Sequence, residues 1–315
     1  MKALTFTLQP HTAFATPLWG DTLFGQLCWA IRHGWGETRL AELLDGYTTG
    51  KPFLVVSDAY PAGYLPLPAL PTRFWSDQPE NAKDRKALKK KVWVPHEALT
   101  QPLKNWRQVA VEDRATGVAP FSRPQPRNSL NRLTFATGEG EGFSPYSVGQ
   151  TWYRGSLEVH LRLDEDRISC VDVREALAAV GASGFGKDAS VGLGKFDVEE
   201  MKAFEPQPHD EPNAWLTLAP CAPQGLAWDA RRSFYRPFTR YGRHGDIAVR
   251  LGNPFKTPIL LAASGAILAP RKPDDWSRSW VGQGLGGDGT LSQVLPSTVH
   301  QGYAPAIALH LPEAV

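Results

Sequence analysis

The sequence has few of the features that mark secreted, membrane or disulfide-stapled proteins. Its three cysteines, Cys28, Cys170 and Cys221, are far apart, odd in number and never in CxxC spacing. This pattern fits a reducing cytosol and disfavours a cysteine zinc site or a disulfide framework. No apolar run approaches the roughly 18 residues of a membrane span. We therefore expect a cytoplasmic protein with no membrane partner.

Charge is also sparse, with 21% charged residues and a formal net charge of +2. This balance excludes a bulk polycation, so a nucleic-acid surface would have to come from local clustering of lysine and arginine. Two such clusters exist, in residues 83–91 (KDRKALKKK) and in the arginine-rich stretch 231–243.

The common catalytic motifs are missing as well. The sequence has no HExxH, no GxSxG, no paired carboxylates at helical spacing and no Cys/His cluster. Asp21 precedes an apolar helical face and is interpreted as a helix N-cap, while Asp188 is a lone acid. His209-Asp210 is an isolated dipeptide in a proline-flanked segment. We expect no enzymatic activity, no metal and no cofactor.

What the sequence does have is a large apolar fraction, 42% of 315 residues, together with 29 glycines and 27 prolines. That amount of apolar surface can form a real core, and the glycines and prolines predict many turns. Domains commonly hold about 100–200 residues, so two domains are expected.

Hydrophobic periodicity predicts an α+β fold. Alternating residues predict strands at 2–8 and 157–163, and apolar residues at helical spacing predict helices after Asp21 and after Asp172. Further strands are expected at 52–57, at 131–137 and through Val198. The resulting order, β-α-β-β-α-β, is typical of a ferredoxin-like domain.

We predict the first ferredoxin-like domain over residues 1–205 and a second, degenerate one over 213–315. The proline-rich stretch 61–126 is interpreted as an extension that projects from the first domain, with a basic surface helix at 80–91. The strands expected in the second domain are 215–219, 247–251, 259–268 and 304–311.

The glycine-rich segment 184–196 (GFGKDASVGLGKF) is the most informative one. Gly181, Gly186 and Lys187 satisfy G-x-x-x-x-G-K, but Asp188 stands where a P-loop needs Ser or Thr, and the loop follows a helix instead of a strand. Two interpretations remain: a surface where backbone and lysines approach phosphates, or a tight turn that packs on its own sheet.

Several segments together resemble the RAMP superfamily of CRISPR proteins. They are GDTLFGQLCWAI (20–31), SDAYP (57–61), LPLPALP (65–71), RNSLNRLTF (127–135) and the segment 184–196. NPFKTPILLAASGAIL (253–268) and HQGYAPAI (300–307) more specifically resemble the Cas group-five family, in particular the fourth-subunit family of type III-A Csm effector complexes.

The resemblance implies two ferredoxin-like (RRM-like) domains and a non-catalytic subunit that holds the 5′ repeat-derived tag of the crRNA. The implied partners are the crRNA, the large signature subunit with its polymerase-like domains, and a backbone RAMP subunit. An RNA tag needs cations for phosphates and aromatic platforms for unstacked bases. The residues expected to contact RNA are Phe14, Trp19, Arg127, Arg132, Gly184, Phe185, Gly186, Lys187, Ser190, Gly192, Gly194, Lys195, Tyr235, Arg236 and Arg240.

Two other functions stay open. Some RAMP relatives cut RNA with a histidine near the first helix, and His11 lies in that neighbourhood, while His33 is interpreted as a helix C-cap or a solvated side chain. Cleavage needs a base, an acid and a cation around one 2′-hydroxyl, and the sequence shows no partner for His11. The other alternative is a scaffold subunit that contacts proteins and scarcely touches RNA.

Overall fold

A four-stranded antiparallel sheet carries the N-terminal half of the chain. The computed structural model describes residues 1–313 except 79, 119, 205, 207, 208, 225, 251 and 273–275. The sheet has the order β2-β7-β1-β8. Its strands and the two helices on one face are β1 (Lys2–Pro10), α1 (Gly20–Trp35), β2 (Leu54–Pro61), β7 (Leu157–Leu163), α5 (Cys170–Ser183) and β8 (Phe196–Ala203). This is the predicted split βαβ order.

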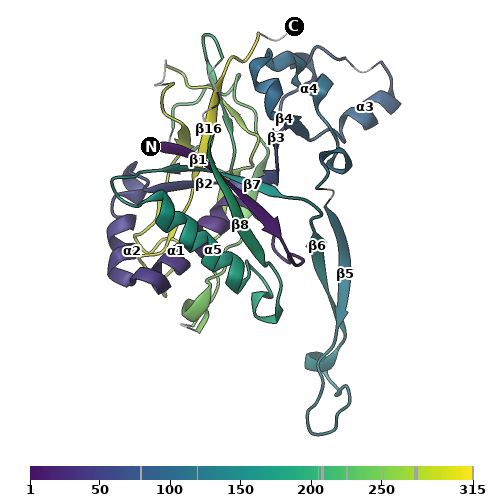
Figure 1. Ribbon diagram of the computed structural model, residues 1–315, viewed down its shortest axis with the longest axis vertical. Helices are drawn as coiled ribbons and strands as arrows, with labels where there is room; N and C mark the ends of the chain where they lie inside the picture. Colours follow the sequence, from purple (N-terminus) through teal and green to yellow (C-terminus); the bar gives the residue numbers. More distant parts are fainter. Residues whose placement is uncertain are drawn as a thin grey trace.

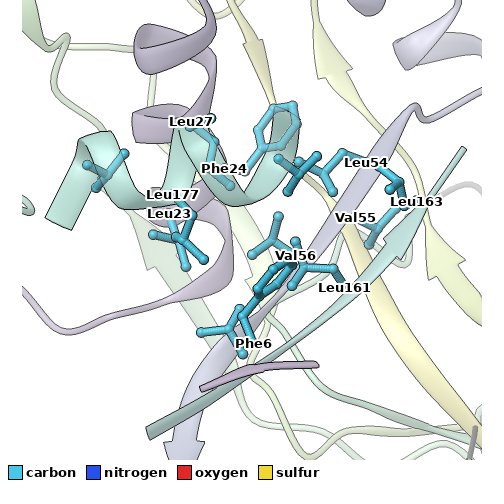
Figure 2. Close-up of a cluster of buried hydrophobic side chains, with 14 of the residues drawn as sticks. Phe6, Leu23, Phe24, Leu27, Leu54, Val55, Val56, Leu161, Leu163 and Leu177 are labelled. Carbon is cyan, nitrogen blue, oxygen red and sulfur yellow. The ribbon is translucent and has the colours of Figure 1, made fainter. Parts of the chain in front are cut away.

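The first core lies between this sheet and helices α1 and α5 (Figure 2). Leu23, Phe24 and Leu27 form one apolar face of α1, because residues three and four apart share a side of a helix. They pack on strand residues such as Phe6 and Val56. A second helix, α2 (Glu37–Leu44), follows α1.

The helix starts differ in detail from the prediction. Asp21 is not the N-cap of α1, because the helix begins at Gly20 and Trp19 takes that position. Asp172 does stabilise the start of α5, as the acidic member of a capping box whose N-cap is Ser169.

Strand β7 is buried on both faces. Its leucines and Val159 face the first core, as the alternation predicts. Its polar residues, Glu158, His160 and Arg162, are buried as well, because a second layer of structure covers the other face of the sheet.

Residues 61–118 form most of a small subdomain instead of a projection. They contain β3 (Tyr64–Pro66), α3 (Ala82–Leu88), β4 (Trp93–Pro95) and α4 (Trp106–Val109), with 3₁₀ turns between them. Trp75 and Trp106 share a second core with Leu216 and Ile267 of the C-terminal half. Helix α3 has no buried residue, as expected of the basic surface helix.

The element that projects from the body is a long hairpin, β5 (Phe121–Arg127) and β6 (Tyr146–Trp152), shown in Figure 1. The strand predicted at 131–137 is wrong. Those residues form turns at the tip of the hairpin, closed by an isolated bridge between Asn131 and Ala136.

A second four-stranded sheet, of order β12-β9-β16-β13, is built by the C-terminal half. The strands after β8 are β9 (Ala214–Thr217), β10 (Pro237–Arg240), β11 (Ile259–Ala262), β12 (Ile267–Leu268), β13 (Trp280–Gly282), β14 (Leu285–Gly286), β15 (Val299–His300) and β16 (Tyr303–Leu309). The described residues contain no α-helix after Ser183, so a second ferredoxin-like unit is not confirmed, although the α+β class is.

Two expected C-terminal strands differ from the structure. Residues 246–250 form a 3₁₀ turn, and residue 251 lies outside the described residues. The stretch 259–268 is split into β11 and β12 by a turn at Ser264 and Gly265.

The predicted boundary between the two domains falls partly on residues 205, 207 and 208, which lie outside the described residues. All three cysteines are free. Among the helices of the described chain, none is both long and apolar enough to cross a membrane.

Candidate nucleic-acid interface

The glycine loop, residues 184–196, follows α5 and is tied at both ends to the segment that leaves β1. Phe185 N donates to Gly194 O at 2.9 Å, which closes the loop on itself. Gly194 N donates to Ala13 O at 2.8 Å. Residues 11–19 are here called the entry segment. The glycine loop therefore packs against this segment.

Close packing accounts for three of the loop's glycines. A Cβ on Gly184 or Gly194 would lie 2.4 or 2.3 Å from a backbone oxygen of the loop, and both residues have a positive φ. A Cβ on Gly186 would lie 2.6 Å from the Thr16 side chain. At Gly192 nothing lies within 4 Å. The tight-turn interpretation thus explains the glycines, and it leaves Gly192 at an open surface.

This difference gives a direct test. Gly194→Ala is expected to lower the free energy of unfolding by about 3 kcal/mol, because the added Cβ strikes backbone. Gly192→Ala is expected to cost only about 1–2 kcal/mol, from its left-handed conformation alone. Urea unfolding of both variants measures the gap, and equal losses would contradict this account of the loop.

The outer face of the loop carries Lys187, Ser190 and Lys195, all exposed. The backbone amides of the two lysines point inward. Lys187 N donates to Thr16 Oγ1 and Lys195 N to Thr12 Oγ1, each at 2.9 Å. These two amides are therefore satisfied inside the protein, and the lysine ammonium groups supply the positive charge.

The loop also contacts the projecting hairpin. Arg127 of β5 forms an ion pair with Asp188 at 3.0 Å, and Phe14 of the entry segment exchanges backbone hydrogen bonds with Thr151 of β6. Arg127 is thus partly neutralised, whereas Arg132 is exposed near the tip of the hairpin.

Two of the predicted stacking residues are core residues. Phe14 and Phe185 are buried in the first core, and the Phe14 ring packs edge-on against Tyr153 at 5.5 Å. The prediction that they stack on bases is wrong. Trp19 and Tyr235 are 37% and 44% exposed and remain available as platforms.

Arg240 is not a free cation. Its guanidinium binds the carboxylate of Asp21 with two hydrogen bonds of 2.7 and 2.9 Å and lies 4.0 Å from the centre of the Trp19 ring. Burial alone would raise the pKa of Asp21, but His300 and Arg240 outweigh burial and lower this pKa. The predicted phosphate contact at Arg240 is therefore corrected to a structural ion pair, while Arg236 is exposed.

A wide groove, with a volume of about 1690 Å³, runs between the entry segment, the 61–118 subdomain and the C-terminal half. Trp19, Tyr235 and Arg236 line it, and basic side chains from the end of α3 contribute to its wall: Arg85, Lys89 and Lys91. Lys91 also donates to backbone oxygens of Arg107 and Gln108.

The entry segment connects the two basic regions. Thr12 and Thr16 bind the glycine loop, and residues 17–19 line the groove. The entry segment therefore contacts the glycine loop through Thr12 and Thr16, and with residues 17–19 it lines the groove that Tyr235 and Arg236 also line. Arg132 lies apart, near the tip of the hairpin.

Sequence reasoning missed the role of Asp58. Gly20 N donates to Asp58 Oδ1 at 2.7 Å and Ser264 Oγ donates to Asp58 Oδ2 at 2.6 Å. The Gln301 side chain pairs with both backbone groups of Val56, at 2.8 and 2.7 Å. Segments 20–31, 57–61, 253–268 and 300–307 thus meet where α1 begins.

Burial raises the pKa of Asp58 to about 7. The folded chain therefore keeps this proton at a pH where the unfolded chain has lost it, and the stabilising contribution is complete below about pH 4 and disappears as the pH rises through about 7. Between pH 5 and pH 8 we expect wild type to lose on the order of 3 kcal/mol more stability than Asp58→Asn does. Parallel pH profiles of the unfolding free energy would contradict this.

The histidines considered for catalysis are paired with acids at the surface. His11 Nε2 lies 2.7 Å from Asp197 Oδ2, and His33 Nε2 lies 2.6 Å from Asp246 Oδ2. The second contact replaces the predicted C-cap role of His33. An exposed His–Asp pair is one part of the constellation that RNA cleavage needs.

The geometry defines a class of protein: a ferredoxin-like sheet joined to a second antiparallel sheet, with a basic loop beside a wide groove. No family model matches the chain, and no curated protein matches it.

Several solved structures are similar to the chain in fold. A chain of the Csm1–Csm4 cassette in complex with pppApA is 17% identical, with a TM-score of 0.61, over 99% of this chain and 100% of that one.

Two further matches agree. A chain of the Csm1–Csm4 cassette in complex with AMPPNP is 18% identical, with a TM-score of 0.60 and coverage of 99% and 100%. A chain of the Csm3–Csm4 subcomplex in the type III-A CRISPR-Cas interference complex is 11% identical, with a TM-score of 0.59 and coverage of 98% and 100%. Csm4 is the subunit common to these assemblies, and the chain shares its fold over the whole length. The resemblance drawn from the sequence is thereby confirmed for the fold.

Proposed function

We propose that the chain is the Csm4-type subunit of a type III-A Csm interference complex and binds the 5′ repeat-derived tag of the crRNA without cutting it. The observation that carries this proposal is the continuity of the loop lysines with the groove, through residues 11–19. Single-stranded RNA is bound by cations that follow its backbone and by aromatic rings that stack on its bases, and both are present here.

Phosphates lie along Lys187 and Lys195 in this proposal, and unstacked bases rest on Trp19 and Tyr235. Arg236 lines the same groove and supplies a further cation. Ser190 and Gly192 are at the outer face of the loop, where a sugar–phosphate backbone can approach without a clash.

The hairpin β5–β6 supplies a second contact. Leu133 and Phe135 at its tip are 91% and 88% exposed. Apolar side chains of this kind wedge between nucleotides or insert into a protein pocket, and Arg132 beside them favours the nucleic acid. The sequence predicted that residues 61–126 project from the body. In this proposal the hairpin β5–β6 is the projecting element instead.

The proposed protein partners are a Csm1-type large signature subunit and a Csm3-type backbone subunit. Support comes from the similar chains, since Csm4 forms a cassette with Csm1 in one set of structures and a subcomplex with Csm3 in another. The chain thereby bridges the two in the cytoplasm, with residues 1–205 and 213–315 as its two domains.

Binding of a labelled tag RNA to the full chain tests this function. Fluorescence anisotropy is expected to show tighter binding of the tag RNA than of DNA with the same sequence, and gel analysis is expected to show intact RNA. Absence of binding would favour the interaction-only scaffold. Specific cleavage that His11→Ala abolishes would favour the endoribonuclease.

A further inference from the structure

Three metal-ligating side chains meet on the side of the first sheet that faces the 61–118 subdomain. Glu158 and His160 come from β7, and His96 comes from the 3₁₀ turn His96–Thr100. One ligand atom of each lies within 4.8 Å of the others. Glu158 and His160 are buried, and His96 is largely covered.

Two nitrogen atoms in this cluster lack a hydrogen bond. Nε2 of His160 and Nε2 of His96 are both buried, and neither has a hydrogen-bond partner among the described residues. A buried polar atom without a partner destabilises the folded chain, so two such atoms beside one carboxylate call for an explanation. A cation bound to the carboxylate of Glu158 would satisfy both nitrogens.

The surrounding contacts orient two of the three ligands. Nδ1 of His160 lies 2.7 Å from Thr5 Oγ1. Gly63 N donates to Glu158 Oε2 at 2.9 Å. Metal-bound histidines usually hold a proton on the second ring nitrogen through such a partner, which leaves the lone pair of the first for the metal.

We propose that His96, Glu158 and His160 form a zinc site that joins β7 to the 61–118 subdomain, with water as the fourth ligand. Two imidazoles and one carboxylate are a ligand set that Zn²⁺ binds, whereas Mg²⁺ and Ca²⁺ prefer oxygen. His96 Nε2 and Glu158 Oε2 lie 3.9 Å apart. Tetrahedral zinc places ligand atoms roughly 3.4 Å apart, so small side-chain rotations close the site.

One of the three ligands lines a pocket. This pocket, of about 840 Å³, is lined by His96 together with Phe204, His209 and His310. Phe204 stacks on the face of the His160 ring at 4.2 Å, which leaves the ring edge, where a metal binds, uncovered by that contact.

Lys202 competes with the metal. Its Nζ lies 2.6 Å from Glu158 Oε1, and its side chain is partly exposed. Zinc therefore binds against the repulsion of a neighbouring ammonium group, or after this side chain has moved into solvent. Removal of the ammonium should strengthen zinc binding, although it removes an ion pair from the protein.

The test uses the full chain, stripped with a chelator and reloaded with zinc alone. Metal analysis is expected to find one zinc per folded chain, and competition with a chromophoric chelator gives its affinity. His96→Gln should weaken the affinity by about a hundredfold or more, since even outer-shell changes cost about 10–100-fold. The matched variant His209→Gln, in the same pocket but outside the cluster, should leave it unchanged.

If His96→Gln does not fold, the zinc affinity of Lys202→Met still tests the proposal. We expect this variant to bind zinc about tenfold more tightly, because an opposing charge is gone. A purely structural Lys202–Glu158 pair predicts lower stability and no gain in affinity. Wild type without zinc, unchanged affinity in His96→Gln or Lys202→Met, or loss of zinc in His209→Gln would each overturn the proposal.

Discussion

Reversal of two charges on the glycine loop, Lys187→Glu with Lys195→Glu, is expected to weaken binding of the tag RNA by about a hundredfold. Each lysine places an exposed ammonium beside the proposed path of the phosphates, and a hydrogen bond to a charged group contributes about 1.5 kcal/mol or more. Loss of two phosphate contacts on single-stranded RNA should also reduce the slope of log affinity against log salt by about 1.4. Anisotropy titrations at several salt concentrations measure both quantities.

Lys51→Glu is the matched control, compared with Lys187→Glu alone. Lys51 is exposed, and its carbonyl accepts from Arg167, which precedes α5, so it lies at the far end of that helix from the glycine loop. The control should bind RNA nearly as wild type does. Equal losses in the two single variants would mean that general charge, and not the loop, controls RNA binding.

Arg240→Ala is expected to lower the free energy of unfolding by about 3–5 kcal/mol, because it removes both guanidinium hydrogen bonds from the buried carboxylate of Asp21, which keeps only the contact of 3.2 Å with His300 among its ion pairs in the described residues. The Asp21 side chain has no exposure to solvent, and its two hydrogen bonds from Arg240 are short. Urea unfolding measures the loss. Arg243→Ala removes an exposed arginine three residues away that lies 5.9 Å from the Phe255 ring, and should change stability by less than about 0.5 kcal/mol.

The double variant Asp21→Asn with Arg240→Met tests whether Arg240→Ala lowers the free energy of unfolding through the unpaired charge of Asp21 or through lost packing. It removes both charges, so it should be more stable than Arg240→Ala alone. If Arg240→Ala instead keeps wild-type stability and loses RNA affinity, the arginine contacts RNA as the sequence first suggested, and the structural ion pair is the wrong explanation.

Local patterns were enough to predict the first sheet. Strand β7 and helix α1 show clean periods of two and of 3.6 residues, and these periods follow from which side chains reach the core. The glycine loop was also located correctly, because glycines with positive φ mark places where backbone approaches backbone.

The hairpin was missed because its strand contains two prolines. Pro124 and Pro126 argue against a strand, since proline cannot donate a hydrogen bond. They lie two residues apart and so have the same orientation, which in this two-stranded ribbon is compatible with pairing to Gly149 and Ser147. The segment 131–137 (NRLTFAT), in which Leu133 and Phe135 alternate with polar residues, was predicted as a strand instead, although it forms the turns at the tip.

The partners of the site residues could not be predicted, because they are distant in the sequence. Arg240 pairs with Asp21, which lies 219 residues away. The residues next to Arg240 in the sequence therefore do not indicate that it forms an ion pair. The cluster of His96, Glu158 and His160 could not be predicted for the same reason, because its members are brought together by the fold. His96 is far from Glu158 and His160, and a search for cysteine spacing cannot find a site without cysteine.

Cross-linking tests the central claim most directly. A tag RNA with a photoreactive uridine is bound to the full chain, irradiated and digested, and the modified peptides are identified by mass spectrometry. We predict adducts in residues 184–196 and 11–19 and on the groove side chains Tyr235 and Arg236. Adducts confined to other faces, such as α2 (Glu37–Leu44), with none in these segments, would contradict the proposed RNA path.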